Sequence, residues 1–175
     1  MMSSYRTGYC RLSSAIFLAV AMLIASGVCL GQAEKKEKDI YNERADAHAE
    51  IQEALQKATA EHKRVIVVFG ANWCYDCHVL DKAFHSADLA PIIAVNYEVV
   101  HIDIGRGEKN QDLMDKYQVP MKRGIPGLAV LDSDGKLVYS QKNGEFENAR
   151  AMSSKDFQEF LNRWKPTPQD LQNLK

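Results

Sequence analysis

The chain has 175 residues, with 22 basic and 23 acidic side chains that leave a formal net charge of −1. This length suffices for one domain with a hydrophobic core, plus extensions. Because the charge is balanced and no basic block stands out, the composition argues against a nucleic-acid-binding protein.

The N-terminus has the layout of a secretory signal peptide. Arg6 and Arg11 precede an apolar stretch over 12–30 without a charged residue, and Gly31-Gln32-Ala33 offers small side chains for cleavage. The alternative is an uncleaved membrane anchor, since the stretch is nearly long enough to span a bilayer. We therefore expect residues 1–33 to be a signal peptide or an anchor of an exported protein.

A linker and an amphipathic helix are expected next, over 34–60. Charged residues fill 34–38, and from Ile40 to about His62 apolar residues recur at near-helical spacing among charged ones. An α/β domain is then expected over 61–165, followed by a tail over 166–175. It begins with the run Val65–Phe69, whose β-branched residues are typical of a buried strand.

A Cys-x-x-Cys motif, Trp73-Cys74-Tyr75-Asp76-Cys77, follows this strand and opens a segment predicted to be helical to about Phe84. Cysteines at i and i+3 lie on one helix face, at a separation that a disulfide can bridge. The first cysteine lies where unpaired N–H groups and the helix dipole favour an anion, and the thiolate is the reacting species. The motif therefore indicates reversible dithiol–disulfide exchange.

The number of cysteines supports reactivity over a structural role. Cys10 and Cys29 lie in the predicted targeting segment, so the exported part keeps only Cys74 and Cys77. Exported proteins usually use cysteines in stabilising pairs, but this pair closes a very short loop and would stabilise little.

The remaining chain predicts a mixed sheet with helices on both faces. We expect a helix capped by 86–88 and running through Val95, strands over 97–104, 127–131 and 136–140, a helix over 110–117, a loop over 119–126, a hairpin turn over 132–135, and a final helix over 157–164 behind a Ser153-x-x-Asp156 capping box. Helices separate the first three strands, which is typical of an α/β fold.

Two segments resemble the thioredoxin superfamily. The stretch from Phe69 to Cys77 is similar to its strand-to-active-site segment, and Gly124-Ile125-Pro126 is similar to the loop with its cis-proline. Among subgroups, the chain is most similar to exported bacterial thioredoxin-like proteins, including the C-terminal domain of transmembrane thiol-reductant carriers. The resemblance implies a thioredoxin fold and thiol–disulfide oxidoreductase activity. The expected amphipathic helix would be an N-terminal addition to this fold, and the predicted signal peptide or anchor leads us to expect a periplasmic location.

The resemblance also implies roles for particular residues and partners. Cys74 would attack, Cys77 would resolve the mixed disulfide, and Trp73, Ile125 and Pro126 would contact the substrate. The partners would be substrate proteins with disulfides and a membrane thiol-reductant carrier as electron donor, and no metal or organic cofactor would be required.

The direction of exchange is expected to be reductive. A carboxylate at Asp76, beside the thiols, disfavours the thiolate and makes the pair a better reductant. A protonated His78 would act the other way, although we expect it to be a partly exposed surface group. A disulfide oxidase or isomerase on the same fold is the alternative.

Two positions depart from the thioredoxin pattern. Val68 stands where thioredoxins carry a buried acid that accepts the proton of the second cysteine. Proton transfer at Cys77 would then depend on water, His78, Asp76 or another group. Gly127 follows the predicted cis-proline, where threonine is common.

Other functions fit parts of the pattern. Cys74-x-x-Cys77-His78 is the attachment pattern of c-type haem, with Met114 and Met121 as candidate axial ligands. Zinc would need further ligands, for which His85 and His101 are candidates. A thioredoxin-fold binding module with unused cysteines is a third alternative.

Overall fold

The computed structural model of the chain describes residues 38–168 and 170. The predicted signal peptide or anchor over 1–33 lies outside these residues. Among the residues that are described, no helix is long and apolar enough to cross a bilayer.

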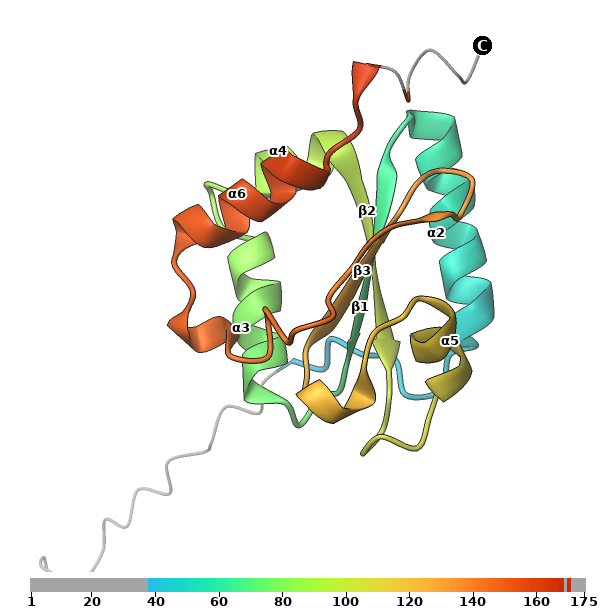
Figure 1. Cartoon of the computed structure of the whole chain (residues 1–175), viewed down its shortest axis with the longest axis vertical. Helices are drawn as coiled ribbons and strands as arrows, with labels where there is room; N and C mark the ends of the chain where they lie inside the picture. Colours follow the sequence, from blue (N-terminus) through green and yellow to red (C-terminus); the bar gives the residue numbers. More distant parts are fainter. Residues whose placement is uncertain (1–37, 169, 171–175) are drawn as a thin grey trace, which may run out of the picture. The chain divides into compact units, whose positions relative to one another are not determined.

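A mixed four-stranded sheet in the order β2-β1-β3-β4 forms the centre of the domain (Figure 1). Strand β1 (Arg64–Gly70) pairs in parallel with β2 (Tyr97–Asp103) and antiparallel with β3 (Gly127–Leu131), which pairs antiparallel with β4 (Leu137–Ser140). Strand β1 is buried along its whole length, as its continuous apolar run predicts.

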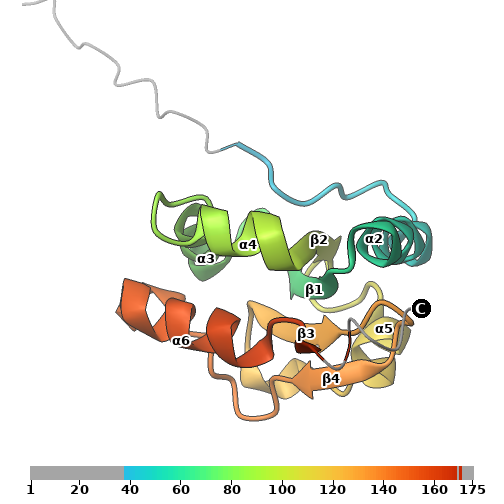
Figure 2. The ribbon, with the colours of Figure 1, turned by 90° about the horizontal axis from the view of Figure 1, so that it is seen from above.

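Helices cover both faces of the sheet (Figure 2). Helices α2 (Ala47–Glu61) and α5 (Gln111–Lys116) lie on one face, and α3 (Tyr75–Phe84), α4 (Ala90–Asn96) and α6 (Ser154–Trp164) lie on the other. Short 3-10 turns, η1 (Met121–Arg123) and η2 (Ala149–Ala151), lie in the loops before β3 and before α6. The predicted mixed sheet with helices on both faces is confirmed.

Alternation along β1 divides the core into two layers. Val65, Val67 and Phe69 pack in one layer with helices α2 and α5. Ile66 and Val68 pack in the other layer with helices α3 and α6. Both layers pack against β1. The end of this strand, and the cysteine segment that follows it, are therefore held in a fixed place.

The N-terminal helix differs most from the prediction. It begins at Ala47 and not at Ile40, because Asp46 caps it by accepting hydrogen bonds from the N–H groups of His48 and Ala49. The residues before the cap are not helical, and this frees Tyr41 to enter the interior of the domain, where it is 2% exposed.

Two other helix starts also differ from the prediction. Helix α4 begins at Ala90 without a side-chain cap, so the predicted cap at 86–88 is wrong. The capping box of Ser153 and Asp156 is confirmed, but it starts α6 at Ser154, three residues before the predicted start.

Candidate functional site

The two cysteines lie at the start of α3, just beyond the end of β1. Cys74 is the N-cap residue of the helix, and Cys77 lies in its first turn. The structure joins them in a disulfide with 5.3 Å between their Cα atoms. The N–H of Cys77 donates a hydrogen bond to Cys74 Sγ at 3.1 Å. A helix N-terminal N–H is therefore directed at the sulfur that the sequence analysis assigns as the attacking one.

The loop of Ile125 and Pro126 lies against this disulfide. The Ile125–Pro126 peptide bond is cis, as predicted. The carbonyl oxygen of Ile125 lies 3.7 Å from Cys74 Sγ, and the carbonyl oxygen of Pro126 accepts a hydrogen bond from Gln141 Nε2 at 3.2 Å. The backbone beside Ile125 is therefore within reach of a chain that is attached to Cys74.

Packing explains the glycine at position 127. A Cβ at Gly127 would lie 2.6 Å from Val119 Cγ1, which is closer than two carbon atoms can approach. Val119 is buried in the core layer of α2 and α5 and cannot move aside freely. The space that a threonine side chain would need is thus occupied by a neighbouring valine.

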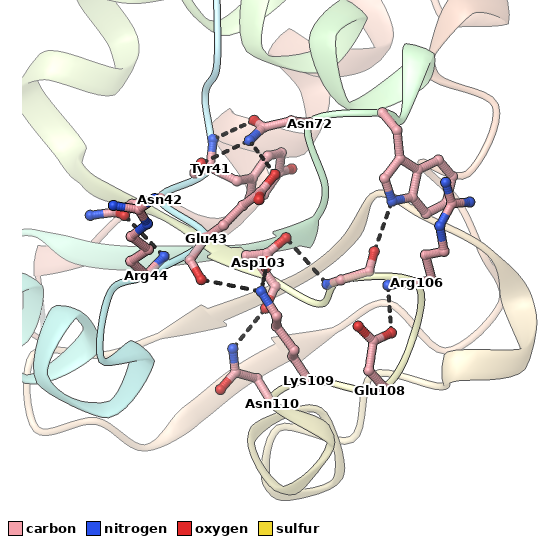
Figure 3. A network of polar contacts seen from close by, with 12 residues as sticks. Tyr41, Asn42, Glu43, Arg44, Asn72, Asp103, Arg106, Glu108, Lys109 and Asn110 are labelled. Atoms are coloured by element: carbon pink, nitrogen blue, oxygen red, sulfur yellow. Dashed lines mark hydrogen bonds and ion pairs between the residues drawn. The ribbon is translucent and has the colours of Figure 1, made fainter.

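Trp73 is exposed beside the disulfide. Its side chain is 56% exposed and so lies outside the core. The indole N–H donates a hydrogen bond to the Gly105 carbonyl oxygen at 2.8 Å, and the Arg106 guanidinium lies 5.7 Å from the ring centre. The ring is thus held in place while most of its surface faces solvent (Figure 3 shows Arg106 in this network).

Asp76 is buried and paired with Arg150. Its carboxylate accepts hydrogen bonds from the Arg150 backbone N–H at 2.9 Å and from Arg150 Nε at 3.0 Å, and it contacts Arg150 Nη2. The Arg150 side-chain hydrogen bond lowers the pKa of Asp76 below its ordinary value. The carboxylate beside the thiols therefore has its own compensating cation, which weakens its expected effect on the thiolate.

His78 is buried, so the expected surface position is wrong. Only 8% of the residue is exposed, and its Nε2 lies 2.7 Å from the carbonyl oxygen of Asn72. Because a carbonyl oxygen only accepts, Nε2 carries the hydrogen. His78 thus fixes the loop between β1 and α3.

Tyr41 is the residue of this site that sequence reasoning missed. It forms a small buried cluster with Cys74 and Cys77. A Cβ at Gly70 would collide with the Tyr41 hydroxyl and lie 2.7 Å from Cys77 Sγ, so both atoms border the space over Gly70. No sequence signal could have found Tyr41, because it lies in a segment whose spacing predicts a surface helix.

The candidate ligands His85, His101 and Met114 have partners or positions away from the cysteines. His85 Nδ1 and His101 Nε2 each lie 3.5 Å from Asp81 Oδ1. Met114 is fully buried in the core, and the Nε2 atom of His78 is directed at Asn72. Over 38–168, the described residues contain no group of three or more His, Cys, Asp or Glu side chains that could hold a metal ion.

Comparisons with known proteins agree with this geometry. A family model described as thioredoxin-like matches residues 46–133. The crystal structure of a disulphide isomerase from Xylella fastidiosa Temecula1 is 40% identical, with a TM-score of 0.68, and the match covers 72% of this chain and 96% of that one. The reduced C-terminal domain of DsbD from Neisseria meningitidis is 22% identical, with a TM-score of 0.50 and coverage of 71% and 98%, and shows similarity of fold alone.

A curated relative is the thiol:disulfide interchange protein DsbD of Pseudomonas fluorescens. It is 25% identical over 120 residues, which are 68% of this chain. The chain spans only 19% of the length of this relative and of the DsbD of a second Pseudomonas strain.

Proposed function

The chain belongs to the thioredoxin-like family, and from this membership we propose that it reduces disulfides of exported proteins through Cys74 and Cys77. The family membership confirms the predicted thioredoxin fold and makes the chain a thiol–disulfide oxidoreductase. What we propose beyond this is that the exchange runs in the reductive direction, that the protein is exported, and that its partners are substrate proteins and a membrane electron donor.

The observation that carries the proposal is the hydrogen bond from the Cys77 N–H to Cys74 Sγ. In the reduced enzyme this N–H and the start of α3 stabilise a thiolate at Cys74. The Cys74 thiolate attacks a substrate disulfide and forms a mixed disulfide. Cys77 then attacks Cys74 Sγ, which releases the reduced substrate and restores the disulfide that the structure contains.

The substrate is proposed to lie along the Ile125–Pro126 loop. The Ile125 carbonyl oxygen, 3.7 Å from Cys74 Sγ, is placed to accept a hydrogen bond from the backbone of an extended substrate. The exposed ring of Trp73, next to Cys74 in the chain, offers an apolar surface to the substrate. Hydrogen bonds to the backbone of a substrate depend little on its amino-acid sequence, which fits an enzyme with several protein substrates.

The reductive direction is supported by the surroundings of Cys74 Sγ. The Cys77 N–H favours the thiolate, but the Ile125 carbonyl oxygen carries a partial negative charge that disfavours it. A weakly stabilised thiolate makes the reduced form a better electron donor. The carboxylate of Asp76 disfavours the thiolate less than its position in the sequence suggests, because Arg150 compensates its charge.

An isomerase is the second candidate, and one observation favours it. The Xylella fastidiosa structure with 40% identity is that of a disulphide isomerase. Two assays separate the candidates: reduction of insulin in the presence of a thiol donor, and reactivation of ribonuclease with scrambled disulfides. We expect the enzyme to make insulin reduction faster than it is with the thiol donor alone, and to reactivate little scrambled ribonuclease. Strong reactivation of ribonuclease without insulin reduction would favour the isomerase.

The location and the electron donor are proposed from the sequence and from the curated relatives. The apolar stretch over 12–30 supports export, and the similarity to thiol:disulfide interchange proteins supports a membrane thiol-reductant carrier as donor. Fractionation of expressing cells, with intact mass of the mature protein, tests this. We expect an exported protein that begins after Ala33, while a full-length cytoplasmic product would contradict export.

A further inference from the structure

We infer that the Tyr41 hydroxyl donates a hydrogen bond to the Cys77 thiolate during exchange and thereby speeds the steps in which Cys77 carries charge. The inference rests on the exchange chemistry of the Cys74–Cys77 pair and not on its direction. It assigns a reaction role to a residue that lies ahead of the family match, which begins at residue 46.

Tyr41 borders the inner sulfur of the pair. The residue is 2% exposed, and Cys77 is 1% exposed in the same cluster. Gly70 leaves the space between them open, because any side chain there would collide with the hydroxyl and crowd Cys77 Sγ. On its other side, the Tyr41 ring meets the edge of the His101 ring, with 5.3 Å between ring centres.

Asn72 holds Tyr41 in this place through its backbone. Asn72 Oδ1 accepts hydrogen bonds from the N–H groups of Ile40 and Tyr41, both at 2.9 Å. Its amide nitrogen donates to the Tyr41 carbonyl oxygen at 2.9 Å and to Glu43 Oε1 at 3.1 Å (Figure 3). Since Asn72 lies in the cysteine loop itself, the segment that carries Tyr41 is attached directly to the active site.

The same segment is fixed at a second point. Lys109 Nζ donates a hydrogen bond to the Glu43 carbonyl oxygen at 3.1 Å and pairs with Asp103 Oδ2 at 2.7 Å (Figure 3). Contacts on both sides of Tyr41 therefore fix where its side chain enters the domain.

The hydroxyl itself has no partner in the oxidised structure. Among the described residues, the buried Tyr41 oxygen has no hydrogen-bond partner. A buried unpaired hydroxyl costs free energy, and nearly all such groups in proteins are paired. The cost is recovered when Cys77 is reduced, because its sulfur then becomes a charged or polar acceptor beside the hydroxyl.

The hydroxyl acts as a donor and not as a base. Burial raises the pKa of Tyr41 above its ordinary value, and the charges of Asp81 and Asp103 raise it further. The group therefore keeps its proton at every working pH. A hydrogen bond from a neutral donor to a thiolate is charge-assisted and stabilises the anion.

Cys77 needs such a donor because its surroundings are apolar. Val68 stands where thioredoxins have a buried acid, and it is fully buried in this domain. Burial away from water raises the pKa of a thiol and leaves less of the reactive thiolate. The hydroxyl offsets this effect at the more deeply buried cysteine, which is 1% exposed against 5% for Cys74.

The steps balance with Tyr41 unchanged. In the resolving step the Cys77 thiolate forms a bond to Cys74 Sγ, and the bond between Cys74 and the substrate sulfur breaks. The two enzyme thiols are oxidised, and the substrate disulfide is reduced by two electrons. The departing substrate thiolate takes up the proton that Cys77 lost. When a thiol donor regenerates the enzyme, Cys77 is the leaving thiolate and the same hydrogen bond stabilises it.

The test compares Tyr41→Phe with Tyr97→Phe. Each change removes one buried hydroxyl and keeps the ring, but the Tyr97 hydroxyl donates to the Leu161 carbonyl oxygen at 2.6 Å in the layer of α6. The measurements are the rates of mixed-disulfide formation and of resolution in stopped flow. The pKa of Cys77 is measured from thiolate absorbance in a Cys74→Ser background.

We expect Tyr41→Phe to slow resolution by between about tenfold and about a hundredfold, the range for a hydrogen bond to a charged group. The pKa of Cys77 should rise, and the oxidised form should be at least as stable as wild type. Tyr97→Phe should destabilise both redox forms and leave the resolution rate unchanged. The rate of attack by Cys74 serves as an internal measure of an intact site.

Two results would overturn the inference: a wild-type resolution rate and Cys77 pKa in Tyr41→Phe, or equal slowing by both variants. A wild-type enzyme that forms no mixed disulfide would instead overturn the proposed exchange itself, on which the inference rests.

Discussion

Cys74 and Cys77 lie three positions apart but have different surroundings. Cys74 caps α3, receives the N–H of Cys77 and faces the Ile125 carbonyl oxygen. Cys77 lies one turn inside, against Tyr41, and is 1% exposed. From this difference we propose that the sulfur of Cys74, which is 5% exposed, meets the substrate, and that the sulfur of Cys77 reaches only Cys74.

This difference predicts that Cys77→Ser converts the enzyme into a trap. The Cys74 thiolate still forms the mixed disulfide, but no second thiol resolves it. Substrate proteins should accumulate covalently on the variant, and they should be visible on non-reducing gels of cell extracts and identifiable by mass spectrometry. Cys74→Ser is the matched control and should trap nothing. If Cys74→Ser traps proteins and Cys77→Ser does not, the two roles are reversed.

Asp76 predicts a dependence of stability on pH. Arg150 lowers the pKa of Asp76 from 3.8, so the charged carboxylate stabilises the folded state above that pH. As the pH falls through the lower pKa of the folded state, this contribution is lost. The difference in unfolding free energy between wild type and Asp76→Asn should thus be constant near neutral pH and shrink in acid, as measured by urea unfolding over a pH series.

Asp134→Asn is the control for this series, because Asp134 is exposed in the hairpin turn. It should follow the wild-type curve at every pH. A difference for Asp76→Asn that persists undiminished in strong acid would contradict the ion pair with Arg150.

At the scale of elements, the sequence predicts features that depend on neighbouring residues, but not contacts between distant segments. The bounds of β3, the end of α3 at Phe84 and the capping box of α6 follow from patterns within a few residues. The approach of Arg150 to Asp76 joins positions 74 apart, and that of Tyr41 to Asn72 joins positions 31 apart. Such contacts depend on the packing of whole elements, which no local pattern records.

The segment before α2 gives a prediction at this scale. Asn72→Ala removes four hydrogen bonds that attach residues 40–43 to the cysteine loop. We expect a loss of unfolding free energy of about 1 to 3 kcal/mol, because these bonds are partly exposed. With Tyr41 less well placed, resolution by Cys77 should also slow. Chemical denaturation and the stopped-flow rate of resolution measure the two effects.

Asn42→Ala is the matched control within the same segment. Its side-chain oxygen accepts only a local, exposed hydrogen bond from the Arg44 N–H at 3.1 Å, so both measurements should stay near wild type. Equal effects of the two variants would show that Asn72 does not hold the segment at the site.

At the scale of the whole molecule, the sheet places every part of the site at one end of β1. The cysteine loop continues from Gly70, the Ile125–Pro126 loop leads into the antiparallel neighbour β3, and the parallel neighbour β2 leads into the Gly105 loop that holds Trp73. Because β1 is the buried central strand, these loops start from fixed positions. The reactive pair thus lies on a rigid base with the Ile125–Pro126 loop beside it, which suits the proposed exchange with extended chains.

The reduction potential of the Cys74–Cys77 pair tests the central claim most directly. The protein is equilibrated with glutathione buffers of graded ratio, and the oxidised fraction is measured by thiol labelling and mass spectrometry. A reductant should give a value near the roughly −270 mV of thioredoxin, since the Ile125 carbonyl oxygen beside Cys74 Sγ opposes a thiolate there. A value near the roughly −120 mV of strong disulfide oxidants would contradict the account.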